Sequence, residues 1–233
     1  MHKAAKLLTI PLIALSLLTL AACAGQTAKQ TAANDKKPEG TITPITNEAQ
    51  MTTNKTTTGQ LAAPAAGDKI VVIETDMGTI KFKLFTEQVP EMTKNFEELA
   101  KAGKFTNVPF HRVIKDFMIQ TGDFDKKNGT GGYSYKGPGT ELPDEIVPGL
   151  KNLYGTVAMA NRGKDTNGSQ FFIVTAKDGA SFLDGGYTII GQVYEGMDVA
   201  DKIADLYIPS SKQAGTPSKI VNMTKATVMP YAP

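Results

Sequence analysis

The 233-residue sequence has very few of the side chains that build disulfides and metal sites. It contains one cysteine and two histidines. A single cysteine excludes an intrachain disulfide, and a zinc site lacks ligands. We predict no metal and no cofactor. A Ser-His-Asp hydrolase would depend on His111, since His2 lies in the leader described below, and a structural hydrogen bond is the favoured interpretation of His111.

The sequence also lacks a strong excess of charge. Residues 68–233 hold 19 Lys and Arg against 20 Asp and Glu, so the net charge of +2 comes from the residues before them. A nucleic-acid-binding domain usually carries a basic patch or stripe. We therefore expect no nucleic-acid partner.

No apolar run is long enough to span a bilayer comfortably. The run from Leu7 to Leu20 has 14 residues, whereas a spanning helix needs about 18 or more. It follows a short basic opening with Lys3 and Lys6 and ends in small residues, which is typical of a signal peptide. We predict that residues 1–22 are a leader and that the protein is exported.

The leader ends at the only cysteine, in the tetrapeptide Leu20-Ala21-Ala22-Cys23. This tetrapeptide resembles the lipobox of bacterial lipoproteins, in which the cysteine is lipidated and becomes the mature N-terminus. The resemblance implies lipidation of Cys23 and an extracytoplasmic protein anchored to the cell membrane or outer membrane. The alternative is an ordinary signal peptide followed by an incidental cysteine.

After Cys23, residues 24–67 have no aromatic residue and are rich in Thr, Ala, Asn, Gln and Lys. Such a segment buries too little apolar surface to offset the entropy of ordering it. We predict a lipidated cysteine and flexible tether over residues 23–67. One folded domain then occupies residues 68–233, which is long enough for a core of its own.

The predicted domain alternates short strands with two helices. Proline at position 90 and glycine at 103 favour a helix over 90–102, and apolar spacing favours another over 196–204. Strands are predicted at 70–75, 79–85, 117–121, 156–160, 170–175, 187–193 and 219–228. Many short strands with two helices indicate a mainly β fold with a closed or nearly closed sheet.

The stretch Phe110-His111-Arg112-Val113-Ile114-Lys115-Asp116-Phe117-Met118-Ile119-Gln120 places the permanent cation of Arg112 among apolar side chains and an amide. On a strand, Met118 and Gln120 share one face. Phe117 joins them only if the chain bends at Lys115-Asp116. The alternative is an ordinary half-buried hairpin in which Arg112 is a surface charge.

Two further motifs follow. The run Asn128-Gly129-Thr130-Gly131-Gly132 could suggest phosphate binding, but it lacks the Lys-Ser/Thr of a P-loop, so a structural turn is favoured. Later, Gln170 and Phe172 alternate with Phe171 and share a face. An amide again lies beside an aromatic ring.

These motifs, in this order, resemble those of the cyclophilins, which are peptidyl-prolyl cis-trans isomerases. The resemblance covers essentially all of residues 68–233. The motifs that carry it are Phe110-His111-Arg112-Val113-Ile114, Phe117-Met118-Ile119-Gln120, Asn128-Gly129-Thr130-Gly131-Gly132, Met159-Ala160-Asn161, Asn167-Gly168-Ser169-Gln170-Phe171-Phe172 and Phe182-Leu183-Asp184-Gly185.

The resemblance implies a closed eight-stranded β-barrel capped by two α-helices, with a groove for proline-containing, unfolded or exported polypeptides. It implies catalytic roles for Arg112, Phe117 and Gln120. The implied substrate-binding residues are Met118, Gly129, Ala160, Asn161, Gln170, Phe172, Phe182, Leu183 and Tyr187. No bond is broken in the reaction, so no nucleophile is needed.

The sequence departs from the commonest family pattern at the groove. Phe182 replaces a frequent tryptophan and Tyr187 a frequent histidine, so we expect weaker cyclosporin binding. Arg162 stands where many relatives have a small residue; it could favour acidic substrate residues, although a solvated arginine is the favoured interpretation. The alternatives to an isomerase that folds exported proteins are a non-catalytic Pro-peptide-binding chaperone or adhesive lipoprotein and a structural envelope lipoprotein.

Overall fold

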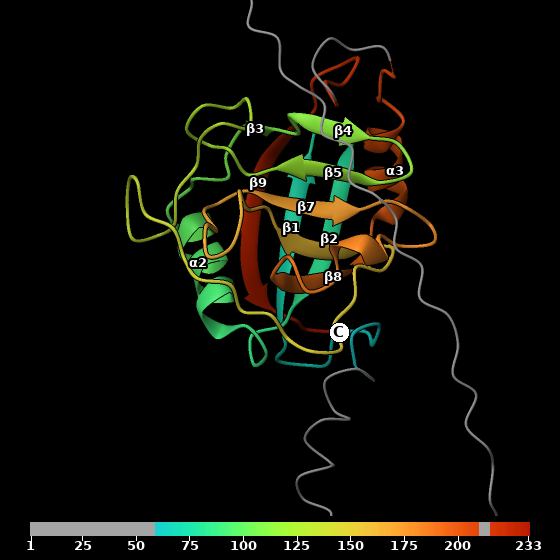
Figure 1. The fold of residues 1–233 in the computed structure, drawn as a ribbon. Helices are drawn as coiled ribbons and strands as arrows, with labels where there is room; N and C mark the ends of the chain where they lie inside the picture. Colours follow the sequence, from blue (N-terminus) through green and yellow to red (C-terminus); the bar gives the residue numbers. More distant parts are fainter. Residues whose placement is uncertain (1–58, 210–214) are drawn as a thin grey trace, which may run out of the picture. The chain divides into compact units, whose positions relative to one another are not determined.

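The computed structural model describes residues 59–209 and 215–233 (Figure 1). The predicted leader, Cys23 and most of the predicted tether lie outside the described residues. The described strands are β1 (Lys69–Thr75), β2 (Gly78–Leu84), β3 (Val108–Pro109), β4 (Arg112–Ile114), β5 (Met118–Thr121), β6 (Thr156–Met159), β7 (Phe171–Val174), β8 (Ile189–Glu195) and β9 (Asn222–Pro230). The helices are α2 (Pro90–Lys101), the 3-10 helix η1 (Ser181–Leu183) and α3 (Met197–Ala204).

These nine strands form one sheet in the order β3-β9-β1-β2-β8-β6-β7-β5-β4, and every neighbouring pair is antiparallel. The helix α2 contacts β9, whereas α3 contacts β2, β4 and β5. In the view of Figure 1, α2 lies at the left of the sheet and α3 at the right. The mainly β fold with two α-helices is therefore confirmed.

The expected closed, eight-stranded barrel is wrong for the described residues. The sheet has nine strands and stays open between β3 and β4, its two end strands. Pro109 in β3 has no N–H to donate to a ladder. Instead, its carbonyl accepts the Thr121 hydroxyl at 2.9 Å, and the Val113 N–H of β4 donates to the Gly215 carbonyl at 2.7 Å.

The first predicted hairpin and the first predicted helix form close to their expected bounds. Thr75 pairs with Gly78 across the turn between β1 and β2. The helix α2 has proline in its first turn, where no N–H is needed. The carboxylate of Glu145 accepts the N–H groups of Glu91 and Met92, which places a negative charge at the helix N-terminus.

The core is built around the aromatic ring that α2 contributes. The Phe96 ring centroid lies 5.6 Å from that of Phe82, 4.8 Å from that of Phe105 and 5.2 Å from that of Phe171. All four side chains are almost fully buried. Phe82 and Phe171 meet Phe96 edge to face, whereas the Phe105 ring is tilted against it. Aromatic pairs at these separations add to the stabilisation from buried area, so α2 and the sheet share one core.

Residues 59–67, which we expected in the flexible tether, contact the domain. The Gln60 side chain is only 4% exposed, and the Gly67 N–H donates to the carbonyl of Tyr231 after β9. We call residues 59–68 the N-terminal strap. The part of the chain that packs on the domain therefore begins earlier than the predicted boundary at 68.

The glycine-rich segment after β5 is a structural turn held by one buried carboxylate. Asp123 is fully buried, and its two oxygens accept the N–H groups of Lys126, Asn128, Gly129 and Gly131 at 2.8 to 3.1 Å. Burial raises the pKa of Asp123, and the four donors lower it more, so the pKa lies below its usual value. These N–H groups face inward, which leaves them no role in a phosphate site.

His111 packs against this turn. A Cβ atom at Gly129 would lie 2.8 Å from Cδ2 of the imidazole. Both ring nitrogens are buried and make no hydrogen bond of standard geometry with the described residues. Burial lowers the pKa of His111, against the opposing effects of the Asp123 carboxylate and of weaker interactions with the Pro109 carbonyl and the Gln170 side chain. The structural hydrogen bond expected for His111 stays a prediction.

Asp123→Ala should destabilise the protein by at least about 2 kcal/mol, because buried N–H groups lose their acceptor. Urea unfolding followed by far-UV circular dichroism measures this change. Asp125→Ala is the matched control, since Asp125 is an exposed carboxylate whose nearest cation is 3.7 Å away. Equal stability of the two variants would contradict the role assigned to Asp123.

The free energy of unfolding should fall as the pH drops from 7 towards 5, and His111 should cause part of that fall. Its folded pKa lies below the usual 6.5, so the unfolded chain takes up a proton in this range while the folded chain resists it. Urea midpoints at both pH values, for the wild type and His111→Gln, measure the effect. The variant should lose less stability, and an identical loss would refute the assignment.

Candidate active site

The hairpin of β4 and β5 places the arginine of the first motif beside an amide. Arg112 is directly opposite Gln120 in the antiparallel register. The Nη1 atom of Arg112 donates to Oε1 of Gln120 at 3.3 Å. The stem of Arg112 lies against Gly215, where a Cβ atom would come within 2.7 Å of the arginine Cγ. The Arg112 side chain is therefore held at its stem by packing and at its guanidinium by one hydrogen bond.

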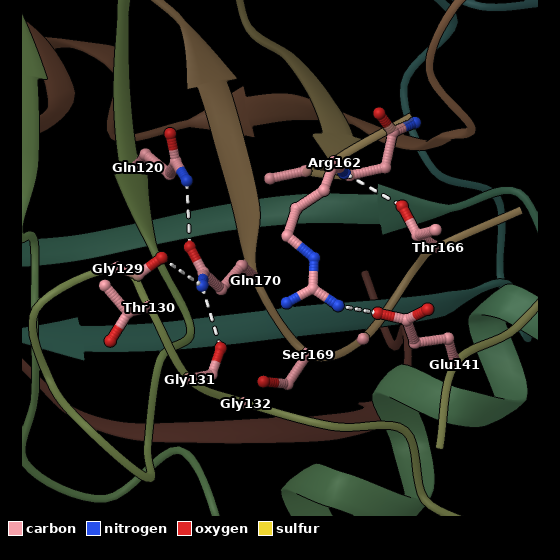
Figure 2. A pocket seen from close by; sticks show the side chains of 13 residues that line it. Gln120, Gly129, Thr130, Gly131, Gly132, Glu141, Arg162, Thr166, Ser169 and Gln170 are labelled. Atoms are coloured by element: carbon pink, nitrogen blue, oxygen red, sulfur yellow. Dashed lines mark hydrogen bonds and ion pairs between the residues drawn. The ribbon is translucent and has the colours of Figure 1, made fainter. Parts of the chain in front are cut away.

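A second amide continues the hydrogen bonding away from the arginine. Gln120 donates from Nε2 to Oε1 of Gln170 at 2.9 Å. Gln170 in turn donates from Nε2 to the carbonyls of Gly129 and Gly131, at 3.0 and 2.8 Å (Figure 2). We call the pair Gln120 and Gln170 the amide relay. It connects Arg112 to the turn that Asp123 holds.

The turn between the strands brings Phe117 to the same side as Met118. It follows the sequence prediction of a bend at Lys115-Asp116, and Asp116 takes a left-handed conformation with φ of 55°. The carbonyl of Phe117 accepts the N–H groups of Thr175 and Ala176, which follow β7. Phe117 and Met118 thus line one cavity although their strand parity differs.

A cavity of about 100 Å³ lies in front of this hairpin. One side chain on β7 forms part of its wall: Phe172, whose ring lies 5.5 Å from that of Tyr187 in an edge-to-face contact. The lining residues are Arg112, Phe117, Met118, Gln120, Ala160, Asn161, Phe172, Leu183 and Tyr187. The structure therefore brings nine of the twelve predicted groove residues to one cavity.

The other three predicted residues lie beside it. Gly129 and Gln170 line a neighbouring cavity of about 130 Å³, which shares Gln120, Ala160 and Asn161 with the first (Figure 2). Phe182 is 77% exposed. Its ring lies 5.4 Å from that of Phe117, so it stands at the rim rather than in the wall.

The neighbouring cavity contains a residue that the sequence reasoning missed. Glu141 forms an ion pair with Arg162 across its edge (Figure 2). The Arg162 side chain is 75% exposed, which agrees with a solvated arginine, and Glu141 offsets its charge. Glu141 lies in a loop without strand or helix spacing, so no sequence pattern could have placed it there.

Asn161 joins the loops on both sides of the groove. Its Nδ2 donates to the carbonyl of Gly186 at 3.0 Å, and its Oδ1 accepts the N–H of Gly163 at 3.3 Å. Within the described residues, the main-chain N–H and C=O of Asn161 make no hydrogen bond. They remain available to a bound peptide.

The chemistry available in this cavity is electrostatic. Its nine lining residues include one guanidinium, two amides and the phenol of Tyr187, but no carboxylate, imidazole, thiol or serine hydroxyl. Such a site can orient an extended chain and stabilise developing electron density. Apart from the Tyr187 phenol, it has no side chain suited to covalent or general acid–base steps.

Comparison with known proteins agrees with this geometry. Residues 70–228 match the family model described as cyclophilin type peptidyl-prolyl cis-trans isomerase/CLD. The peptidyl-prolyl cis-trans isomerase-like 1 of Neurospora crassa is 44% identical over 160 residues, which are 68% of this chain and 93% of that protein. The mouse protein of that name is 45% identical over 134 residues, 57% of this chain and 78% of that protein.

Solved structures give the same result. A crystal structure of a cyclophilin type peptidyl-prolyl cis-trans isomerase from Cryptosporidium parvum has a TM-score of 0.64 and 34% identity, covering 71% of this chain and 99% of that one. A second structure of that protein was determined in the presence of the dipeptide Ala-Pro, with a TM-score of 0.63 and 34% identity over 70% of this chain and 99% of that one.

The predicted extracytoplasmic, membrane-anchored location is contradicted by these relatives. They are eukaryotic proteins named peptidyl-prolyl cis-trans isomerase-like 1 and, in Schizosaccharomyces pombe, isomerase 9, and none of these names is that of a lipoprotein. In residues 59–209 and 215–233, no helix combines the length and apolar character needed to cross a membrane. We withdraw this location.

The prediction of enzyme class is confirmed. The family match spans more than half of the chain, and relatives at 44–46% identity are named peptidyl-prolyl cis-trans isomerases. The chain belongs to the cyclophilin-type peptidyl-prolyl cis-trans isomerases.

Proposed function

We propose that the cavity in front of β4 and β5 is the catalytic groove, and that Arg112, Phe117 and Gln120 are its catalytic residues. The substrate is an X–Pro bond in an unfolded polypeptide segment. The observation that carries this proposal is the position of Arg112, whose guanidinium donates to Gln120 at the edge of a cavity that has both polar and apolar walls.

The barrier to rotation about a peptide bond is about 18 to 20 kcal/mol, because resonance gives the C–N bond partial double-bond character. As the amide twists, this resonance is lost and the proline nitrogen regains its lone pair. An N–H of Arg112 directed at that nitrogen makes an interaction that is stronger in the twisted state than in either planar state. Such a difference is what lowers a barrier.

The fixed position of Arg112 supports this role. Gln120 accepts from Arg112 and donates to Gln170, so both ends of its amide are in use. An amide anchored at both ends cannot turn to follow the substrate. The guanidinium is then set before the substrate binds, and little reorganisation is needed as the bond twists.

The remaining lining residues hold the substrate in two halves. Phe117, Met118, Phe172 and Leu183 surround the proline ring with apolar surface, while Asn161 offers its main-chain N–H and C=O to the extended chain. Gly129 and Gln170 continue the binding surface into the neighbouring cavity. One half of the substrate is gripped and the other half turns.

The likeness to a protein crystallised with Ala-Pro supports a proline-containing ligand. Our prediction that the clients are exported proteins depended on the location that the relatives contradict, and it is not carried into this proposal. Weak cyclosporin binding stays a prediction that follows from Phe182 and Tyr187. The exposure of Phe182 at the groove rim is consistent with a contact to large ligands.

The chain before the strap carries a separate, sequence-based proposal. The tetrapeptide ending in Cys23 supports cleavage after residue 22 and lipid modification of the cysteine sulfur, with residues 24–58 as a spacer. The folded domain then comprises the strap and residues 69–233. No cellular location is part of this proposal.

Arg112→Ala should lower kcat/KM for a short X–Pro peptide by about a hundredfold, the usual effect of removing one preorganised donor. Arg112→Lys should recover little, because an ammonium lacks the planar fork of donors. The assay follows cis-to-trans exchange with the purified protein, and circular dichroism confirms that each variant is folded.

Lys115→Ala is the control for Arg112→Ala, because Lys115 is an exposed cation in the same hairpin that pairs with Asp205 on the surface. It should keep wild-type activity. Full activity of a folded Arg112→Ala protein would exclude the proposed mechanism. A folded wild-type protein that binds proline peptides without accelerating exchange would be a binding module instead.

Lipid modification can be tested by mass spectrometry of the mature protein. We expect the N-terminal peptide to begin at Cys23 with a mass increase that matches a diacylglyceryl group on its sulfur. Cys23→Ser should abolish the increase. An intact N-terminus at Met1, or an unmodified Cys23, would show that the tetrapeptide is incidental.

A further inference from the structure

The N-terminal strap, residues 59–68, places one polar side chain deep in the domain. The Gln60 amide pairs with the backbone of Lys151 in both directions: Nε2 donates to the carbonyl at 2.7 Å, and Oε1 accepts the N–H at 3.0 Å. This is the pattern by which one strand residue pairs with another. Here the Gln60 side chain, and not a second backbone, makes both hydrogen bonds.

Two further buried side chains complete the contact. Gln60 also donates to the hydroxyl of Thr156 at 3.1 Å, and Thr156 donates to Gln192 at 3.1 Å. All three side chains are at least 93% buried. A buried polar group that loses its partner costs free energy, so this cluster fixes the backbone at Lys151.

Asn152, the residue after Lys151, connects this fixed backbone to the segment that lies beside the groove. The N–H and Nδ2 of Asn152 both donate to Oδ1 of Asp184, at 2.8 and 3.1 Å. Its carbonyl accepts the N–H of Ala180 at 2.7 Å. Asn152 therefore binds the residues on either side of η1.

The helix η1 forms one wall of the catalytic groove. Its last residue, Leu183, lines the cavity that holds Arg112. Its middle residue, Phe182, stands beside Phe117 at the rim. Side-chain anchors within η1 are few, since none of its three residues is buried, so the wall depends on the contacts that flank it.

We propose that Gln60 is a positioning residue of the isomerase: through Lys151, Asn152 and Asp184 it sets the place of η1 and hence of Leu183 in the groove. Gln60 lies before residue 70, where the family match begins. The strap thus adds a support for the substrate pocket from outside the matched domain. This proposal rests on the proposed role of Leu183 in binding the substrate.

The test compares full-length wild type with Gln60→Ala. We expect KM for an X–Pro peptide to rise by about three- to tenfold, as for groups coupled through one hydrogen-bond network, with kcat nearly unchanged. The methyl resonances of Leu183, in leucine-labelled protein, should shift as well. Leu61→Ala is the matched control, since Leu61 is the next residue and is 68% exposed; it should change neither readout.

Asp184→Ala removes the hydrogen bonds between Asn152 and Asp184, which belong to the same series of contacts between Gln60 and η1. In that background, Gln60→Ala should raise KM no further, so the two effects should not add. Additive effects would overturn the proposal, as would unchanged KM and unchanged Leu183 resonances in a folded but less stable Gln60→Ala protein. If Gln60→Ala does not fold, Gln60→Met, which keeps the volume and removes the hydrogen bonds, carries the same test.

The two readouts separate this inference from the proposed function. An inactive wild-type protein would refute the proposed function, and the Leu183 resonances would still report whether Gln60 positions η1. Shifted resonances with unchanged KM would show that η1 moves but that Leu183 does not bind the substrate. The first result would reject the proposed function, and the second would reject the proposed role of Leu183 in substrate binding.

Discussion

The proposed catalytic groove depends on a positive charge that is held in place by neutral groups. Arg112 donates to Gln120, Gln120 donates to Gln170, and Gln170 donates to two backbone carbonyls. Every bond in this series runs in the same direction, because each amide accepts at one end and donates at the other. The series ends on the turn that the buried carboxylate of Asp123 organises. The guanidinium group is thereby held in one orientation, and its charge is not neutralised.

This choice of amides has a chemical reason. A carboxylate at position 120 would bind Arg112 as a bidentate ion pair, and it could not donate to the next residue. The guanidinium would then be occupied when a substrate arrives. Arg162 shows the contrast, because it is exposed and paired with Glu141. The two arginines of the domain therefore differ in their partners: Glu141 offsets the charge of Arg162, whereas the amide of Gln120 leaves the charge of Arg112 unneutralised.

Local features of the fold were largely predictable from the sequence. Proline at 90 and glycine at 103 bound α2, and alternation placed Met118 and Gln120 on one face. The open edge between β3 and β4 was not predictable, because it depends on a two-residue strand that ends in a proline. Glu141 was missed for a related reason: its contact joins two loops, and loop residues carry no periodic signal. Motifs report strands and helices well, and contacts between irregular segments poorly.

The N-terminal boundary of the domain, predicted at residue 68, was also misplaced because it depends on contacts that a sequence pattern does not reveal. The composition of residues 24–67 indicated a flexible segment, because apolar side chains are the usual sign of ordering. The strap, however, is held by a glutamine, which composition counts as a polar residue. Gln60 is ordered because Lys151, Thr156 and Gln192 meet its hydrogen-bonding groups inside the domain. A polar segment therefore joins a folded unit when buried groups of that unit can form hydrogen bonds with it. For Gln60 these groups lie about 90 to 130 residues further along the chain.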